Sequence, residues 1–258
     1  MSTAREPAQV AVEVCLARMQ AIVRRRRASR EELATVAGWL GDRRKAVQRC
    51  AAQTLAGLVR QHSVVCAMLR ERLGHGPAHA QWGAIYAFAL MDRLPADALP
   101  VLLGVLGSHD GDVRWAAVHM LVRLKGEPGV AVALRAVVRA GDAMQRKMAA
   151  YCLRDCGFAT PETESALIDR MSDEHPEVRL AAVSGVARLA CDRARVTRQL
   201  LAMIFDDPSP GVCRAVAVAL ARVGHGSPEV IAALRRAARG PDLSLRRAAE
   251  RSLRLLCG

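Results

Sequence analysis

Large aromatic side chains are scarce in this chain of 258 residues, which contains three Trp, two Tyr and three Phe. A globular core uses such rings to fill much of its interior, so their scarcity favours thin layers of helix packed on helix. Lysine is scarcer still, because only Lys45, Lys125 and Lys147 contribute to the 38 basic residues. The net charge of +13 suggests nucleic-acid binding. An arginine excess is also typical of GC-rich, bacterial-like sequences, so the charge alone does not decide the function.

Long apolar runs are missing as well. None approaches the roughly 20 residues that a membrane-spanning helix needs, and residues 1–7 lack the pattern of a signal peptide. The hydrophobic content of 52% in turn excludes a disordered tail. We therefore expect a cytoplasmic protein that does not bind membranes.

The eight cysteines include no C-x-x-C pair. The chain is long enough to build a core without a disulfide framework, and Cys152 and Cys156 are four residues apart on an expected helix. We interpret them as small apolar core residues. His75 and His79 lie on either side of Gly76-Pro77, which disfavours the continuous helix that would bring both side chains to one metal ion. No metal site and no cofactor are therefore expected.

A repeat of 32 to 34 residues runs through the chain. The segment that begins at Asp112 and reads Asp-Val-Arg-Trp-Ala-Ala returns from Glu177 as Glu-Val-Arg-Leu-Ala-Ala. With Val113 as the marker of the repeat, the seven equivalent positions are Val47, Ala80, Val113, Gln145, Val178, Val212 and Leu245.

Each repeat is predicted to contain two helices, A and B. The A helix carries apolar columns eleven and seven residues before the marker, one helical turn apart. These columns are Val36, Leu69, Leu102, Leu134, Leu167, Leu201 and Leu234, then Leu40, Leu73, Leu106, Val138, Met171, Phe205 and Ala238. In the B helix the marker and the positions four, eight and eleven after it form the apolar side, and positions two, six, nine and thirteen point away from it. Asp110, Asp142 and Asp242 are expected to cap B helices.

The recurring Asp, Val-Arg, Ala-Ala and Leu, as in Asp110, Val113-Arg114, Ala116-Ala117 and Leu121, resemble the HEAT-repeat family. The resemblance is closest to its short phycobilisome-lyase-like class. It implies an all-α, right-handed α-solenoid, in which each hairpin contacts only its neighbours. We expect one domain over 1–258, with an N-terminal capping helix in 1–28 that ends in four Arg, and seven repeats in 29–258.

The resemblance also implies a ladder of hydrogen bonds between neighbouring repeats, made by the Asp and by the Arg after the marker. The residues that match are Asp110, Arg114, Asp142, Arg146, Arg179, Asp242 and Arg246. The ladder is expected to be interrupted where the Arg is replaced, at Gln48, Gln81 and Cys213.

The B helices of HEAT-like solenoids line the concave surface, so a partner would meet positions two and six after each marker. We call these fourteen positions the B-helix face. Two of the three Trp and both Tyr fall there, together with five basic residues and no acid. Exposed rings flanked by Arg are typical of stacking surfaces and protein hot spots, although packing of Trp82 on Trp115 between repeats would also explain them. The candidate binding residues are Arg49, Trp82, Tyr86, Trp115, His119, Lys147, Tyr151, Arg214, Arg247 and Arg251.

Charge is unevenly distributed along the chain. Residues 1–85 carry a net +8, residues 86–178 carry −3, and residues 179–258 carry +8. The basic ends and the aromatic centre would suit a nucleic-acid backbone or an acidic protein segment. Surface charge scattered without function is the remaining interpretation.

The residues do not match the catalytic motifs of known HEAT-like enzymes. HEAT-like alkylpurine DNA glycosylases have a Trp with an Asp one turn later, but here Trp82 is followed by Tyr86, and Trp115 by His119. Deoxyhypusine hydroxylases need His-Glu pairs, which this chain lacks. No phosphate-binding loop or nucleophile elbow is present. We expect no catalytic residues and a non-enzymatic scaffold that holds an acidic or extended protein segment. The alternative is a DNA- or RNA-binding protein, and the oligomeric state stays open.

Overall fold

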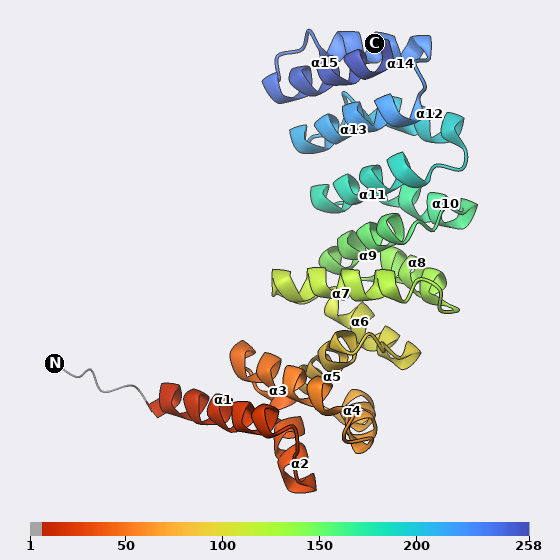
Figure 1. The fold of residues 1–258 in the computed structure, drawn as a ribbon. Coiled ribbons are helices and arrows are strands. Elements are labelled where there is room, and N and C mark those ends of the chain that lie inside the picture. The colour runs from red at the N-terminus through yellow and green to blue at the C-terminus, as the bar shows by residue number, and fades with distance from the viewer. Residues whose placement is uncertain (1–6, 258) are drawn as a thin grey trace, which may run out of the picture. The chain divides into compact units, whose positions relative to one another are not determined.

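The computed structural model describes residues 7–257. In that range the chain contains fifteen α-helices and two short 3-10 helices, and no strand (Figure 1). The α-helices are α1 (Pro7–Arg25), α2 (Arg30–Gly38), α3 (Lys45–Leu58), α4 (Val64–His75), α5 (Ala78–Leu90), α6 (Leu99–Val105), α7 (Gly111–Arg123), α8 (Val130–Ala140), α9 (Ala143–Cys156), α10 (Pro161–Arg170), α11 (Pro176–Leu189), α12 (Arg193–Met203), α13 (Pro210–Val223), α14 (Pro228–Ala237) and α15 (Leu243–Cys257). The 3-10 helices are η1 (Trp39–Gly41) and η2 (Ala96–Ala98). The prediction of an all-α helical-repeat fold is confirmed.

The chain forms two compact units, unit 1 (Met1–Leu102) and unit 2 (Leu103–Gly258). The division falls within α6, the shortest α-helix among the described residues. Pro95 lies before α6 and Pro100 lies in its first turn, where the missing backbone N–H costs little. The single domain expected over 1–258 stays a prediction, and each unit is described by itself.

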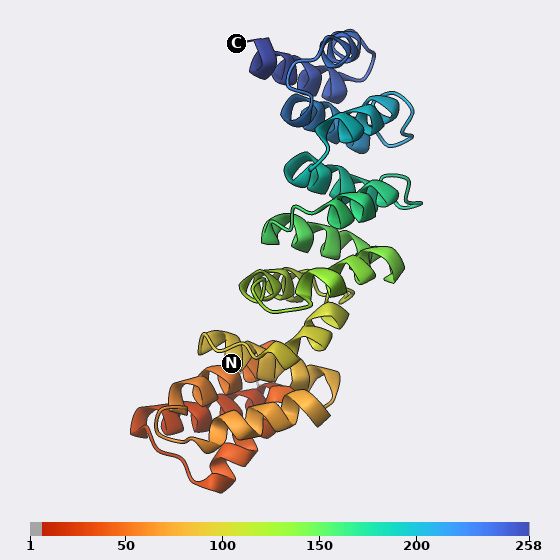
Figure 2. The same cartoon turned by 90° about the vertical axis from the view of Figure 1, so that its right-hand side faces the viewer.

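In both units consecutive helices form hairpins that stack on one another. In unit 1, α3 packs between α1 and α5, and α4 packs on α5. In unit 2 the B helices α7, α9, α11, α13 and α15 follow one another, and A helices such as α8 and α10 form a second layer (Figures 1 and 2). Each hairpin therefore buries its apolar side against its sequence neighbours, as the repeat predicts. No helix in the described range is long and apolar enough to cross a membrane.

The predicted apolar columns of the A helices are largely buried, with exceptions in the sixth repeat and at the half-buried Ala238 of the seventh. In the sixth repeat the columns were assigned to Leu201 and Phe205, but the fully buried residues of α12 and its C-cap are Val196, Leu200 and Ile204. Phe205 is 37% exposed instead and lies under the guanidinium of Arg236, 4.1 Å from the ring centroid. The step from the marker Val178 to the marker Val212 is 34 residues rather than 33. The extra residue lies in the loop between α12 and α13, so the buried columns of α12 are one residue earlier than the marker predicts.

Helix ends follow the sequence closely. Asp110 and Asp142 accept hydrogen bonds from backbone N–H groups in the first turns of α7 and α9, and Asp242 accepts one from the N–H of Leu245. The three predicted caps are thus confirmed. Cys152 and Cys156 are buried in α9, as expected. Burial raises the pKa of the Cys156 thiol to about 11 and that of Cys152 further, so both remain protonated core side chains.

Candidate binding face

None of the fourteen positions of the B-helix face is buried. Trp115 is 45% exposed and Val218 is 48% exposed, and the side chains of His119, Arg214, Arg247 and Arg251 are also exposed. Lys147 and Tyr151 are half-buried. The pattern of positions two and six therefore identifies side chains that a partner could reach.

Two rings of this face stack on each other in unit 2. Trp115 on α7 and Tyr151 on α9 have ring centroids 5.8 Å apart and ring planes 23° apart. The guanidinium carbon of Arg154 lies 4.7 Å from the centroid of Tyr151. Burial, with a smaller effect of Asp155, raises the pKa of the Tyr151 phenol. The rings thus form a rigid apolar shelf with a cation at one side.

Arg154 connects this shelf to the next repeat. Its Nε donates to Asp155 at 2.8 Å, and its Nη1 donates to the hydroxyl of Ser184 on α11 at 2.8 Å. The candidate residues chosen from the sequence omit Arg154 because they were read from positions two and six. It occupies position nine, which the same helical pattern points away from the core. Reading every outward position would have found it.

A groove of about 520 Å³ continues the face across α11, α13 and α15. Its apolar lining includes Leu180, Val218 and Leu255, and Leu255 is 79% exposed. Arg214 and Arg251 also line it, and the described lining residues include no acid. Arg247 is exposed on α15 but does not line the groove. The complete lining is Leu180, Val183, Ser184, Ala187, Gly211, Arg214, Ala215, Val218, Ala219, Arg222, Ala248, Arg251, Ser252 and Leu255.

The remaining candidates lie in unit 1. Arg49 is exposed on α3, and Trp82 and Tyr86 are half-buried one turn apart on α5. A part of each ring is therefore accessible, and the structure shows no stacking between these two rings within the described residues.

Arginines after two of the markers bridge neighbouring repeats in unit 2. Arg146 donates to both carboxylate oxygens of Asp173 at 2.8 Å, and Arg179 donates to both oxygens of Asp207 at 2.7 and 2.9 Å. The acceptors lie five residues before the next marker. They differ from the expected ladder residue Asp142, whose carboxylate caps its own helix.

The other two ladder arginines, Arg114 and Arg246, do not bridge neighbouring repeats within residues 7–257. Arg114 donates to the carbonyl of Ser108 at 2.6 Å. Arg246 has no side-chain partner within residues 7–257. Interruption was expected at the three replaced positions, but the amide of Gln48 donates to the carbonyls of Leu40 and His79 and so joins two repeats of unit 1. A neutral amide can thus replace the ion pair.

The remaining replaced positions follow the expectation. The amide of Gln81 donates to the carbonyl of Leu73, and the thiol of Cys213 donates to the carbonyl of Asp207. Both acceptors lie within the same repeat as the donor, so neither side chain bridges repeats.

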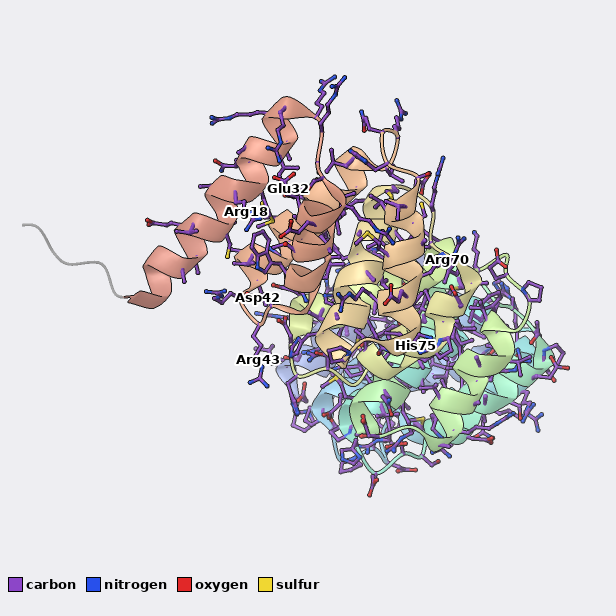
Figure 3. The ribbon with its side chains drawn as sticks, turned by 90° about the horizontal axis from the view of Figure 1, so that it is seen from below. Arg18, Glu32, Asp42, Arg43, Arg70 and His75 are labelled. Atoms are coloured by element: carbon purple, nitrogen blue, oxygen red, sulfur yellow. The ribbon has the colours of Figure 1, made fainter. Side chains whose placement is uncertain are left out.

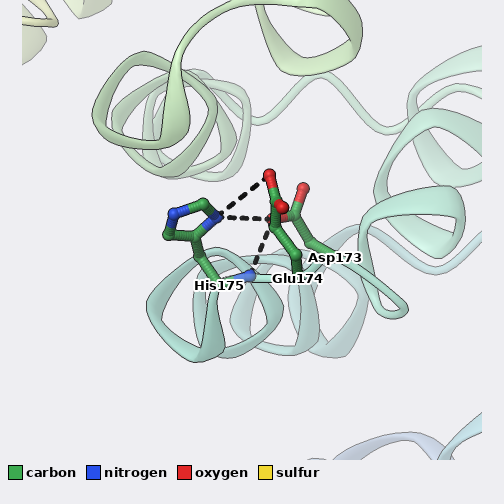
Figure 4. A group of neighbouring side chains, drawn as sticks. All are labelled: Asp173, Glu174 and His175. Carbon is green, nitrogen blue, oxygen red and sulfur yellow. Dashed lines mark hydrogen bonds and ion pairs between the residues drawn. The ribbon is translucent and has the colours of Figure 1, made fainter.

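One group of potential metal ligands, Asp173, Glu174 and His175, lies in the loop before α11 (Figure 4). Asp173 is already engaged, because Arg146 occupies both oxygens and the backbone N–H of His175 donates to one of them at 3.1 Å. Burial alone would raise the pKa of Asp173, but these hydrogen bonds lower it below its usual value. The group is therefore explained as part of an inter-repeat ion pair. His75 and His79 are both exposed in unit 1, and Figure 3 labels His75.

Several solved structures match this chain at low sequence identity. A designed armadillo repeat protein is 17% identical over 87% of this chain and 99% of its own, with a TM-score of 0.45. Human deoxyhypusine hydroxylase in complex with glycerol is 18% identical over 96% and 99%, with a TM-score of 0.41. The Escherichia coli protein YibA is 12% identical over 98% and 99%, with a TM-score of 0.48. No curated protein sequence matches the chain significantly.

The sequence also matches the model of HEAT repeats over residues 67–154 and 164–254. The two matched segments cover more than half of the chain and include most of the repeats read from the marker positions. Repeats of this kind are known from protein-binding scaffolds. This chain belongs to the HEAT-repeat family.

Proposed function

We propose that this chain is a non-enzymatic scaffold that holds a segment of a partner protein on its B-helix face. The observation that carries the proposal is the groove of unit 2, where Leu180, Val218 and Leu255 offer apolar contact. Leu180 and Val218 hold positions two and six of their repeats, which were expected to face outward. A groove of this kind fits a segment with apolar side chains at helical or extended spacing.

Charge favours an acidic segment. Arg214 and Arg222 have no side-chain partner within residues 7–257, and Arg251 makes only a 3.5 Å contact with a backbone carbonyl. Their guanidinium groups are therefore available for carboxylates of a partner. Such complementarity contributes mainly to the rate and specificity of association.

The aromatic shelf extends the same face toward α7. Trp115 retains an accessible surface beside His119, and Lys147 follows on α9. Stacked rings lose little conformational freedom on binding, which is why Trp and Tyr are frequent in hot spots. In unit 1, Arg49, Trp82 and Tyr86 supply a second set of the same residue types.

Matched substitutions of two exposed valines test the proposal. Val218→Asp places a carboxylate in the groove, whereas Val132→Asp makes the same change on α8, where Val132 is 62% exposed. We expect Val218→Asp to reduce capture of a protein partner from a lysate at least tenfold, because a charge is desolvated against apolar groups. Val132→Asp should leave capture unchanged, and equal capture by both variants would refute the assignment of the groove.

The same proteins distinguish nucleic acid from protein. Arg214, Arg247 and Arg251 would also suit phosphates, so binding of random duplex DNA is measured at low and high salt. We expect at most weak DNA binding, which high salt abolishes. Val218→Asp should reduce this binding no more than Val132→Asp does. DNA binding that depends on Val218 would favour the alternative function.

A further inference from the structure

A second pocket, of about 740 Å³, lies within unit 1 where α1, α3 and α5 end. The three helices lie side by side, α3 against both of the others. The residues that line the pocket are Val23, Arg26, Gln53, Thr54, Ala56, Gly57, Leu58, Val59, Arg60, Gln61, Leu90, Met91 and Arg93. The pocket is large enough for a small organic ligand.

Each helix contributes one arginine to this pocket. Arg26 follows α1, Arg60 follows α3 and Arg93 follows α5. All three are exposed, and none of their side chains has an ion-pair or hydrogen-bond partner within residues 7–257. The described lining residues include no carboxylate. Three positive charges therefore face one cavity without compensation.

Helix capping does not account for these arginines. Cations often stabilise the free carbonyl groups at a helix C-terminus. Here a backbone N–H group already donates to one of the last carbonyls of each helix, namely from Arg26 to Val23, from His62 to Leu58 and from Arg93 to Phe88. None of the three guanidinium groups donates to a helix carbonyl within residues 7–257, so they remain available for a ligand.

The backbone turns sharply at two of the three sites. Arg26 has a φ of 52° and Asp92, which precedes Arg93, has a φ of 55°. Residues other than glycine rarely adopt this left-handed conformation, which is frequent at functional sites. Arg26 directly follows α1 and lines the pocket, and Asp92 lies two residues after the end of α5, directly before the pocket residue Arg93.

We propose that this pocket binds the phosphate group of a small phosphate ester. A phosphate monoester or diphosphate offers enough charged oxygens to accept hydrogen bonds from three guanidinium groups. A single carboxylate accepts a bidentate pair of hydrogen bonds from only one. Gln53 and Gln61 add neutral donors. Val23, Leu90 and Met91 provide apolar surface for the organic part of the ligand, which the cavity has room to hold beside the phosphate.

The test is calorimetric titration of the full chain with inorganic pyrophosphate, and in separate arms with a nucleoside diphosphate and a sugar phosphate. The variant Arg26→Gln, Arg60→Gln and Arg93→Gln is compared with a control that loses the same charge, Arg24→Gln, Arg43→Gln and Arg70→Gln. The control arginines are exposed in unit 1 and do not line the pocket, and Figure 3 shows Arg43 projecting away from the ribbon. Circular dichroism and thermal melting establish that both variants fold.

We expect the wild type and the control to bind pyrophosphate alike, and the pocket variant to bind at least tenfold more weakly, because charge-assisted hydrogen bonds are lost. Tighter binding of either ester than of pyrophosphate would identify the organic part that the apolar side accepts. The proposal is overturned if wild type does not bind pyrophosphate, if both variants weaken equally, or if citrate binds as tightly as pyrophosphate. None of these results depends on the partner groove of unit 2.

Discussion

The two units join their repeats with different chemistry at the same position of the repeat. In unit 2, Arg146 and Arg179 form two-point ion pairs with Asp173 and Asp207, and in unit 1 Gln48 bonds two backbone carbonyls instead. In unit 1, Arg25 and Arg44 pair with Glu32 and Asp42 on the surface. Arg26, Arg60 and Arg93 instead line a pocket and have no side-chain partner within residues 7–257. The comparison teaches that a basic composition can serve the structure in one region and remain free for a ligand in another.

The largest expected effect follows from breaking an ion pair of unit 2. Arg179→Met leaves the carboxylate of Asp207 buried without its cation, and this should reduce the free energy of unfolding by about 3 kcal/mol. Arg246→Met is the matched control, since Arg246 holds the same repeat position but has no side-chain partner within residues 7–257. Urea unfolding measures the free energy of unfolding of both variants. Equal losses would show that the Arg179–Asp207 ion pair is not the source of the stabilisation.

Acid should weaken unit 2 more than unit 1. Burial alone would raise the pKa values of Asp173 and Asp207, but hydrogen bonds from Arg146 and Arg179 lower both. The folded state therefore binds fewer protons than the unfolded chain, and the stabilisation is complete above the unfolded pKa and lost as pH falls through the lowered folded values.

In unit 1 the lowered pKa values of Glu32 and Asp42 belong to pairs with arginines on the surface, which contribute little to stability. We expect hydrogen exchange, corrected for its intrinsic pH dependence, to accelerate first in α11 and α13 as the pH falls below 4. The loss should be smaller than that of Arg179→Met, since protonation removes only the charge of one partner. Earlier acceleration in α3 and α5 would contradict the comparison.

A smaller effect is expected for the amide bridge of unit 1. Gln48→Leu leaves the carbonyls of Leu40 and His79 without this donor, at a cost of about 1–2 kcal/mol. Gln81→Leu removes a single bond within one repeat and should cost less. Hydrogen exchange of α3 and α5 measures the change, and a greater loss for Gln81→Leu would refute the role assigned to Gln48.

The smallest effect on stability concerns the aromatic shelf. A double-mutant cycle with Trp115→Ala and Tyr151→Ala should give a coupling energy of about 0.5–1 kcal/mol, as stacked rings do. Trp115 is 45% exposed, so its replacement should reduce partner capture while changing the melting temperature little. A sharp drop in melting temperature would show instead that the ring is a packing residue.

The repeat could be predicted from the sequence because its phase is carried by many small, regularly spaced apolar residues. The same regularity fails where the loop length changes, as it does at Leu201 and Phe205, because a marker in one helix cannot fix the phase of another across a longer turn. Capping by Asp110, Asp142 and Asp242 was predictable because it depends on neighbours in the chain.

Contacts between repeats were less predictable. Asp173 and Asp207 lie in loops, and only the packing of one hairpin on the next brings them to Arg146 and Arg179. Likewise, the pocket of unit 1 depends on how three helix ends meet. In the sequence Arg26 is one of four Arg that end the capping helix, and nothing there connects it with Arg60 or Arg93. The exposed face, in contrast, was accessible to prediction from helical periodicity alone.

Hydrogen exchange of the captured complex tests the proposed scaffold function most directly. The partner is isolated on the wild-type chain, and exchange is compared with and without it. We predict protection confined to α11, α13 and α15, with a smaller effect around Trp115 and Tyr151, and no change in α10, α12 and α14. Protection of those A helices, with α11, α13 and α15 unchanged, would contradict the assignment of the partner to the B-helix face.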